Sequence, residues 1–274
     1  MKSLFYYRDD DLFVHHTIDE RPEPDNFPVH AHERMEIFYF LSGHGAYLIE
    51  GSQYELSEGD VLIMRHAGTH KLLILPDAPY ERIAIHFSPR LLVPLDPEGA
   101  LLRPFLNRPL GHMNCVTSAL GKQAGRLLQL DTLQASPYQT RLRVVSYLLP
   151  LLCELKSSFS MGAADAAKGE MQSLAVQLTT YINDHLYTDI SLDTLCKVFF
   201  LSRSQINRVF TRATGTSVWR YVTIKRLLAA RAMIRNHEPA GAVCVRCGFS
   251  DYSAFYRSYK ARFGCSPAED ARRA

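Results

Sequence analysis

Two stretches of sequence decide the fold of the C-terminal part: Ser202-Arg-Ser-Gln-Ile-Asn-Arg-Val-Phe-Thr-Arg-Ala-Thr-Gly215 and Asp251-Tyr-Ser-Ala-Phe-Tyr-Arg-Ser-Tyr-Lys-Ala-Arg-Phe-Gly264. Each starts with a short polar residue, repeats apolar residues every three or four positions and ends in glycine, which is the pattern of a capped amphipathic helix. Six positions recur at a constant offset of 49 residues: Ser204 and Ser253, Ile206 and Phe255, Arg208 and Arg257, Phe210 and Tyr259, Gly215 and Gly264, and Ser217 and Ser266. Such a repeat indicates a duplicated supersecondary unit.

The residues before the first stretch predict a second helix and a turn. Residues 191–198 form a short helical pattern that Ser191 can cap, with an aspartate in the first turn, where the helix dipole favours an anion. After a turn, Ser202 and Gln205 have the spacing of a capping box at the start of the next helix, which Gly215 ends. The first copy is therefore predicted to be a helix-turn-helix.

The second copy follows a long helical segment. Its first helix is predicted over 240–247, and its second helix runs from Ser250 or Asp251 to Phe263. The segment 217–236 between the copies is strongly helical in pattern. A helix of that length spans about 30 Å, and successive major grooves on one face of DNA lie about 34 Å apart. One chain could therefore present two helices to adjacent major grooves.

The outward faces of the two predicted helices are rich in polar side chains that recognise nucleic acid. Arginine, asparagine, glutamine and serine can hydrogen-bond to base edges and phosphates. For one such helix alone, an ordinary solvated surface is an equal alternative, and the repeat favours DNA binding. The residues predicted to contact DNA are Ser202, Arg203, Ser204, Gln205, Asn207, Arg208 and Arg212 in the first copy and Ser253, Ala254, Tyr256, Arg257 and Lys260 in the second. Arg212 and Lys260 are assigned to phosphates.

The charge is distributed unevenly along the chain. Residues 171–274 hold 15 Lys and Arg against 7 Asp and Glu, whereas residues 1–170 hold 16 against 21. A basic segment favours phosphate contact and an acidic one does not. DNA binding is therefore expected in the C-terminal part only.

The length of 274 residues allows two domains. We expect an N-terminal domain over 1–156, a linker over 157–170, which is small and polar, and a C-terminal domain over 171–274. The segment 116–156 has helical, leucine-rich stripes that predict a homodimer surface. No apolar run is long enough to span a bilayer and the start lacks the apolar core of a signal peptide. With six scattered cysteines interpreted as reduced thiols, we expect a cytoplasmic protein without membrane contact.

The N-terminal part is predicted to be rich in β-structure. Short runs of β-branched and aromatic residues, separated by Gly, Ser and Pro, predict strands over 36–41, 46–50, 61–64, 70–75 and 81–87. Closely spaced short strands favour a sandwich or barrel. The predicted fold class is thus α+β with two domains: a β-barrel followed by helices, then an all-α domain with two helix-turn-helix motifs joined by a linker helix.

A histidine-rich motif lies within these strands. His30 and His32 are followed by Glu36, and His70 comes later at a spacing that resembles the two cupin motifs, which ligate one metal inside a barrel. Arg65 and Ala67 replace the proline and glycine of the second motif. A set of three histidines and one carboxylate suits a divalent first-row metal. The alternative is a polar pocket for an organic effector, formed by His30, His32, Glu36, Phe38, Phe40 and His70, or a barrel that is simply filled. No cofactor is assigned beyond this candidate divalent metal.

Residues 171–274 resemble the DNA-binding domain of the AraC/XylS family of bacterial transcription regulators. The matching stretches are Ser191-Leu-Asp-Thr-Leu, Leu201-Ser202, Phe210 to Gly215, Gly248-Phe-Ser-Asp-Tyr-Ser-Ala-Phe255 and Gly264-Cys-Ser-Pro267. Ala240 is smaller than the aliphatic residue usual in the family, and Gly241 lowers helix propensity by about 1 kcal/mol relative to alanine.

This resemblance implies a regulator without enzymatic activity. Such a protein binds double-stranded promoter DNA and RNA polymerase, and responds to a small-molecule effector, for which a sugar or a small organic acid is expected. Activation is favoured over repression. Two alternatives remain: a metal-dependent cupin enzyme with an accessory helical domain, and an effector-independent regulator whose barrel only dimerises.

Overall fold

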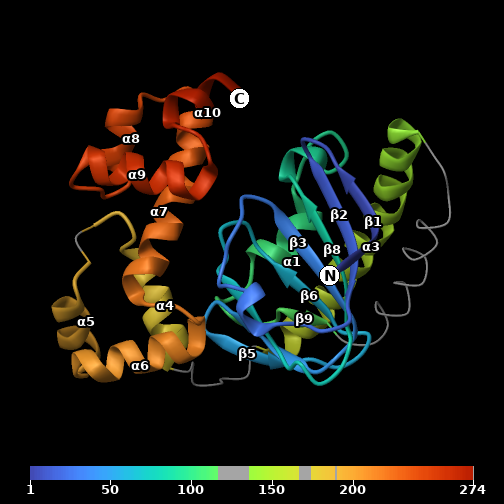
Figure 1. Cartoon of the computed structure of the whole chain (residues 1–274), viewed down its shortest axis with the longest axis horizontal. Coiled ribbons are helices and arrows are strands. Elements are labelled where there is room, and N and C mark those ends of the chain that lie inside the picture. Colours follow the sequence, from blue (N-terminus) through green and yellow to red (C-terminus); the bar gives the residue numbers. More distant parts are fainter. Residues whose placement is uncertain (117–135, 167–173, 189, 274) are drawn as a thin grey trace. The chain divides into compact units, whose positions relative to one another are not determined.

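The computed structural model describes residues 1–116, 136–166, 174–188 and 190–273. The chain divides into two compact units, Met1–Gln172 and Ser173–Ala274 (Figure 1). The N-terminal unit is rich in strands and the C-terminal unit is helical, which confirms the predicted α+β class.

Two antiparallel sheets form the N-terminal unit. The strands are β1 (Lys2–Arg8), β2 (Leu12–Asp19), β3 (Met35–Ser42), β4 (Gly45–Ile49), β5 (Ser52–Glu55), β6 (Val61–Met64), β7 (His70–Ile74), β8 (Tyr80–Phe87) and β9 (Cys115–Val116). The larger sheet has the order β1-β2-β8-β3-β6-β9 and the smaller sheet the order β5-β4-β7. The non-sequential neighbours β8 and β3 lie at the centre of the larger sheet, where Figure 1 shows them side by side.

Strand β3 is buried on both faces and separates two cores. Because side chains alternate along a strand, Ile37 and Tyr39 join one core, together with Leu148 and Leu152 of helix α3 (Pro137–Ala166). Phe38 and its neighbours on the other face join a second core with residues of β4, β6 and β7. Glu36 lies on this second face, which therefore faces the space between the two sheets.

Short helical segments lie between the strands, one between β2 and β3 and three between β8 and β9. They are η1 (Pro24–Asn26), η2 (Pro89–Leu91), η3 (Ala100–Leu102) and α1 (Arg103–Leu106). Phe105 of α1 is fully buried and its ring meets that of Phe87 at a centroid distance of 5.5 Å. Phe105 thereby joins the core that β8 and α3 share.

The five predicted strands are confirmed, with end shifts of one residue or so. Neither His30 nor His32 lies on a regular strand, and His30 pairs with His70 in an isolated bridge. Strands β1, β2, β5 and β9 were not predicted. The pattern of β1 is mostly exposed, as expected of an edge strand, and therefore carries little hydrophobic signal.

Helix α3 changes the predicted boundary between domains. It begins at Pro137 and continues to Ala166. Residues 157–166 are therefore helical and the predicted linker is wrong over that range. The sequence is small and polar, but alanine and methionine favour a helix. The predicted helical residues 117–135 and the rest of the linker, 167–170, lie outside the described residues.

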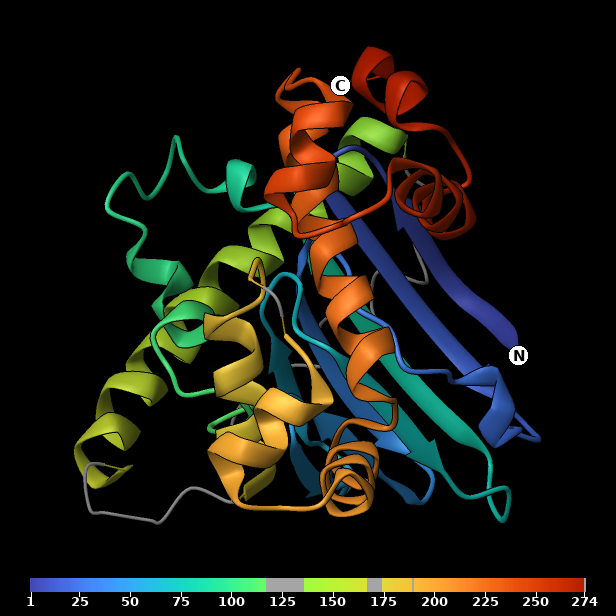
Figure 2. The ribbon, with the colours of Figure 1, turned by 90° about the vertical axis from the view of Figure 1, so that its left-hand side faces the viewer.

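The C-terminal unit contains two helix-turn-helix motifs. The helices are α4 (Leu174–Asp184), α5 (Leu192–Phe199), α6 (Arg203–Thr214), α7 (Val218–Arg235), α8 (Ala240–Arg246), α9 (Tyr252–Phe263) and α10 (Pro267–Arg273). Helix α7 runs between the set α4–α6 and the set α8–α10, as the two ribbon views show (Figure 2). Each set has its own apolar core, and α7 contributes to both. The predicted linker helix and both motifs are confirmed.

Within the described ranges, no helix combines the length and apolar character that crossing a membrane requires.

Candidate functional site

Helix α6 is capped at both ends and presents a polar face. The hydroxyl oxygen of Ser202 accepts a hydrogen bond from the backbone N–H of Gln205, and the Gln205 side chain accepts one from the backbone N–H of Ser202. Gly215 ends the helix at a φ of 71°. Ile206 and Phe210 are fully buried, which fixes the rotation of the helix. The predicted DNA-contacting residues Ser202, Arg203, Ser204, Gln205, Asn207, Arg208 and Arg212 are all exposed.

Helix α9 has the same length and the same glycine end. Asp251 caps it by accepting hydrogen bonds from the backbone N–H groups of Ser253 and Ala254. Phe255 and Tyr259 are buried in the positions that Ile206 and Phe210 occupy in the first copy. Of the predicted DNA contacts, Ser253, Tyr256, Arg257 and Lys260 are exposed and Ala254 is half-buried.

Arg203 differs from the other exposed basic residues of α6. Its guanidinium binds the carboxylate of Asp193, which lies in the first turn of α5, with distances of 2.7–2.9 Å. Both side chains are exposed, so the pair is weak in energy, but it directs Arg203 toward α5. Arg208 and Arg212 are the other exposed arginines of this helix.

Arg226 of α7 connects the two motifs, a role that the sequence did not reveal. Its guanidinium donates hydrogen bonds to the carbonyl oxygens of Leu186 and Thr188 at 2.7 and 2.8 Å, and to that of Gly248 at 2.6 Å. Gly248 has a φ of 78°, and a Cβ there would lie 2.8 Å from Cζ of Arg226. The Arg226 side chain thus holds the turn before α9 close to residues 186–188, which precede α5 of the first motif.

A second buried network holds the C-terminal helix. Asp270 of α10 is 1% exposed and accepts hydrogen bonds from Nε of Arg231 at 2.6 Å, Nε of Arg235 at 3.0 Å and the Tyr259 hydroxyl at 2.8 Å. Burial raises the pKa of Asp270, but the hydrogen bonds from Arg231, Tyr259 and Arg235 and the charge of Arg231 together lower it overall. Helices α7, α9 and α10 are joined through this one carboxylate.

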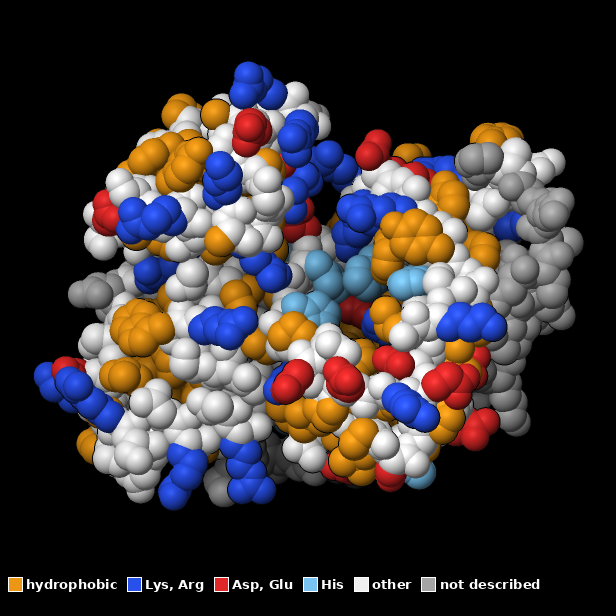
Figure 3. Space-filling model, in the orientation of Figure 1, with side chains coloured by type: hydrophobic (Ala, Val, Ile, Leu, Met, Phe, Trp, Pro, Cys, Tyr) orange, Lys and Arg blue, Asp and Glu red, His pale blue; other side chains and the backbone are white. Residues whose placement is uncertain are grey.

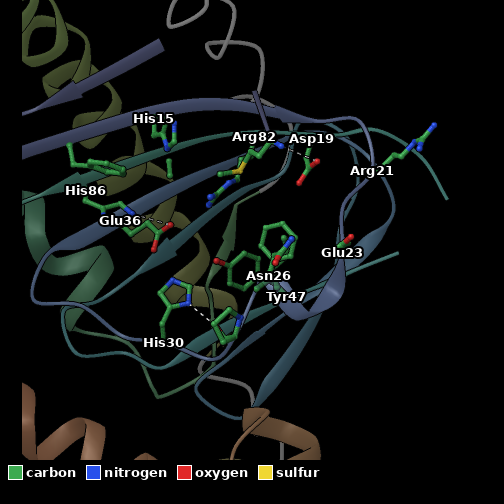
Figure 4. Close-up of a pocket in the computed structure, with 16 residues that line it drawn as sticks. His15, Asp19, Arg21, Glu23, Asn26, His30, Glu36, Tyr47, Arg82 and His86 are labelled. Atoms are coloured by element: carbon green, nitrogen blue, oxygen red, sulfur yellow. Dashed lines mark hydrogen bonds and ion pairs between the residues drawn. The ribbon is translucent and has the colours of Figure 1, made fainter. Parts of the chain in front are cut away.

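The N-terminal unit contains a cavity of about 520 Å³, a size typical of small-molecule sites. In Figure 3 pale blue histidine side chains gather around a hollow with an acidic side chain at its floor. Figure 4 shows the lining residues, which are Met1, Phe13, His15, Asp19, Arg21, Glu23, Asn26, Phe27, Pro28, His30, Glu36, Tyr47, Leu72, Arg82, Ala84 and His86. Of the six predicted pocket residues, His30 and Glu36 line the cavity. Phe38 and Phe40 do not, because they are buried in the core between the sheets.

Four histidines surround Glu36. Its carboxylate lies 2.7 Å from Nε2 of His32, 3.2 Å from Nε2 of His70 and 3.4 Å from Nε2 of His86. His30 packs against His70 with ring centroids 4.2 Å apart. The four residues of the predicted motif are therefore brought together. His86, which the sequence did not single out, joins them because β8 pairs with β3 in a register that puts it directly opposite Glu36.

Hydrogen bonds fix the tautomers of three of these histidines. The Nδ1 atoms of His30, His32 and His70 lie 3.1, 2.8 and 2.9 Å from the backbone carbonyls of residues 28, 34 and 68. A carbonyl can only accept, so each Nδ1 carries the proton and donates it. In a neutral imidazole Nε2 then has a lone pair, and Nε2 of His32 and of His70 lie beside Glu36.

The ionisation of the cluster makes this arrangement unusual. Burial lowers the pKa of His30 to about 3 and that of His32 to about 4. Burial alone would raise the pKa of Glu36, but His86 and the hydrogen bonds from the other imidazoles hold it well below its ordinary value. The hydrogen bond between His32 Nε2 and the Glu36 carboxylate needs a second proton on a ring whose Nδ1 already donates to a carbonyl, and Nε2 of His70 is buried without a hydrogen-bond partner. A cation would satisfy all of these groups.

The donor set fits a metal ion. Two groups of side chains, His30 with His32 and His70, and His32 with Glu36 and His86, each have ligand atoms within 4.8 Å of one another. Histidines that ligate a metal commonly donate their other ring N–H to a backbone carbonyl, as three do here. Imidazole and carboxylate ligands suit zinc, iron, manganese or nickel.

Two helix-turn-helix motifs on one rigid helix, with a separate unit that encloses a polar cavity, define a DNA-binding regulator with a sensor domain. Comparison with protein families agrees: residues 14–129 match the AraC-like ligand binding domain and residues 195–273 match a helix-turn-helix domain. The two matches together span most of the sequence. The chain belongs to the AraC family of transcription regulators.

Curated relatives match along almost the whole chain. The HTH-type transcriptional activator RhaR of Mannheimia succiniciproducens is 24% identical, and RhaS of Enterobacter sp. is 26% identical; each alignment covers 92% of this chain and 90% of the relative. Among solved structures, fatty acid-bound ToxT of Vibrio cholerae is 12% identical with a TM-score of 0.40, covering 95% of both chains. A probable AraC family regulator of Rhodopseudomonas palustris is 28% identical, with a TM-score of 0.34 over 37% of this chain and 98% of its own.

Proposed function

We propose that this protein activates transcription by binding promoter DNA through α6 and α9, under the control of a small effector in the cavity of the N-terminal unit. The observation that carries the proposal is the pair of equally long, capped helices whose exposed polar faces follow the same pattern. Arg208 and Arg257 occupy equivalent positions on the two helices, and both are exposed. The relatives named activators support the direction of control.

Assembly and further contacts belong to the same proposal. Helix α3 buries Val144, Leu148 and Leu152 in the core but leaves Tyr138 70% and Leu142 51% exposed. These two residues are four positions apart and lie on one helix face, which supports homodimer formation through α3. Activation requires a contact with RNA polymerase, and action on chromosomal DNA would take place in the cytoplasm.

We assign the histidine cluster to sensing rather than to catalysis. His30, His32, Glu36, His70 and His86 would hold a divalent metal, which could fix the cavity or bind an oxygen atom of the effector. The alternative of a cupin enzyme loses support because the chain combines the cavity with two DNA-binding motifs. Turnover of oxidisable or isomerisable substrates by the metal-loaded protein would support the enzyme alternative.

The DNA-binding part of the proposal is tested by paired substitutions. A duplex selected from random DNA by the wild-type protein serves as the operator. Each of Arg208→Ala and Arg257→Ala should weaken binding by about 1–3 kcal/mol and relax base preference in its own half of the site. Arg246→Ala is the matched control, because Arg246 lies on α8 beside Glu238 and off the recognition helices. Unchanged footprints for both variants would contradict the assignment.

The spacing of the operator gives a second test. Since α7 holds both motifs, one protomer should protect two segments about 10 base pairs apart. Insertion of about five base pairs between the segments puts the second on the opposite face of the duplex. Affinity should then fall toward that of one motif. Unchanged affinity would mean that only one copy binds DNA.

A further inference from the structure

Arg82 of β8 is a cation in the lining of the cavity, together with the exposed Arg21 and the amino group of Met1. Strand β8 directs Ile83 and Ile85 into the core under α3 and directs residues 82, 84 and 86 into the cavity. Figure 4 shows the Arg82 guanidinium pointing into the space that Glu36 and His86 also face. Its Nε is buried without a hydrogen-bond partner, and no salt bridge to Arg82 occurs within the described residues. An arginine in this position needs a partner, because an unpaired polar group is costly to bury.

The carboxylates that line the cavity are already engaged elsewhere. Asp19 lies 3.4 Å from the amino group of Met1, and Glu36 is surrounded by the histidine cluster. Glu23 is exposed. The residues paired with Arg82 on the two neighbouring strands, Thr17 of β2 and Phe40 of β3, carry no charge. The charge of Arg82 helps burial to lower the pKa of His15. No carboxylate of the described residues therefore pairs with Arg82, and an anion from outside the protein would supply that partner.

The rest of the cavity suits the body of a small organic molecule. Phe27, Tyr47 and Leu72 supply apolar surface, and Asn26 adds an amide. A carboxylate matches the planar guanidinium, because its two oxygens can accept parallel hydrogen bonds. A neutral polyol could hydrogen-bond to Arg82 but would leave its charge unpaired.

We propose that the effector cavity binds a small organic acid, with the carboxylate of the acid on Arg82 and its remaining part between the apolar wall and the histidine cluster. This inference rests on the proposed sensor function and narrows its ligand to an anion. The free acid and its neutral amide are then distinguishable ligands. Sugars without an acidic group become the alternative outcome of the test.

Matched pairs of probes test the proposal on the full-length protein without DNA. The probes are acetate and acetamide, gluconate and gluconamide, and benzoate and benzamide, titrated to about 100 mM while the Arg82 Nε–H resonance is followed by NMR and affinity by calorimetry. Comparison with spectra of Arg82→Lys assigns the resonance. At least one acid should move it and bind about tenfold more tightly than its amide, a difference of about 1.4 kcal/mol.

Two variants separate a specific site from general charge attraction. Arg82→Gln should weaken binding of that acid by about tenfold or more, whereas Arg21→Gln, at the exposed rim, should change it by less than about twofold. Equal melting temperatures of the two variants without ligand would show that both are folded. If Arg82→Gln unfolds, Arg82→Lys replaces it and should reduce affinity while retaining part of the preference for the acid.

Several results would overturn the proposal. They are an Arg82 resonance that no acid moves, equal binding of acids and amides, and acid binding that does not depend on Arg82. If neutral sugars bind and acids do not, the effector is not an anion, but the sensor function still stands. Acid binding at Arg82 in a protein that fails to control a reporter gene would keep the site and reject the regulatory function.

Discussion

Glu36 and Asp270 are both carboxylates with 1% exposure, one in each unit, and their surroundings differ in kind. Asp270 receives hydrogen bonds from two arginines, which stay charged at all ordinary pH values, and from a tyrosine hydroxyl. Glu36 faces imidazoles, and those of His30 and His32 have lowered pKa values while their Nδ1 protons point to backbone carbonyls. The first cluster is complete within the protein. The second lacks a cation, which distinguishes a candidate binding site from a structural one.

Asp270→Asn should cause the largest decrease in the free energy of unfolding. Loss of one partner from a buried ion cluster costs about 3–5 kcal/mol, and we expect the lower end because the Arg231 and Arg235 side chains are 21% and 38% exposed. Trp219 of α7 is the single tryptophan of the chain, so its fluorescence during urea unfolding reports on the C-terminal unit. Asp193→Asn is the control in the same unit. Equal unfolding midpoints for both variants would show that Asp270 is not structural.

Glu36→Gln, by contrast, should not reduce the stability of the protein. The amide can donate to Nε2 of His32, so the variant should be as stable as the wild type or more stable in metal-free buffer. It should bind Zn²⁺ about 100-fold more weakly, which corresponds to about 2.7 kcal/mol. Calorimetry measures both quantities. His44→Gln is the matched control, because His44 is exposed beside Asp77 and away from the cluster; a similar loss of Zn²⁺ binding there would reject the site.

Acidification should destabilise the N-terminal unit at a higher pH than the C-terminal unit. Because the pKa values of His30 and His32 are lowered from 6.5 to about 3 and about 4, the unfolded N-terminal unit binds protons more readily than the folded one. Their contribution to stability is full above pH 6.5 and is lost as pH falls toward 4. The lowered pKa of Asp270 preserves its contribution until pH falls below 3.8.

Scanning calorimetry between pH 7 and 5 measures this difference. The transition of the N-terminal unit should move to lower temperature, and the one followed by Trp219 fluorescence should be affected less. A His30→Gln, His32→Gln double variant should flatten the pH dependence. If the double variant keeps the wild-type slope, the two histidines do not control it.

The smallest effect is expected for the exposed pair of Asp193 and Arg203. Its geometry is bidentate, but solvent screens the charges, and such pairs contribute less than about 1 kcal/mol. A double-mutant cycle with Asp193→Ala and Arg203→Ala, followed by Trp219 fluorescence, measures the coupling. A coupling energy comparable to the loss in Asp270→Asn would show that burial is not what separates these carboxylates.

The sequence predicted local features of the fold well. Capping residues such as Ser202 and end residues such as Gly215 act on backbone groups of their own helix, so their positions suffice to place helix ends. The run of β-branched and aromatic residues in β3 also sufficed, because both faces of that strand are buried. The same approach failed for residues 157–166, where small residues are compatible with both a linker and a helix.

Features that depend on pairing between distant segments were not predicted. His86 joins Glu36 through the register of β8 on β3, and Arg82 faces the cavity for the same reason. Asp270 and Arg226 acquire their roles only when α7 packs on helices from both motifs. Phe38 and Phe40 were placed on the correct face of β3, but the smaller sheet covers them before the cavity begins.

The internal pairing of arginines affects how DNA affinity should depend on salt. Among the 15 basic side chains of residues 171–274, Arg203, Arg231, Arg235 and Arg246 lie beside carboxylates, and Arg226 binds backbone carbonyls. Counterions leave DNA only where a free cation replaces them, at about 0.9 ions per phosphate neutralised. Affinity should therefore fall with a smaller power of salt concentration than the number of basic residues implies. A larger share of the binding free energy is then left to base contacts, which carry sequence preference and depend little on ionic strength.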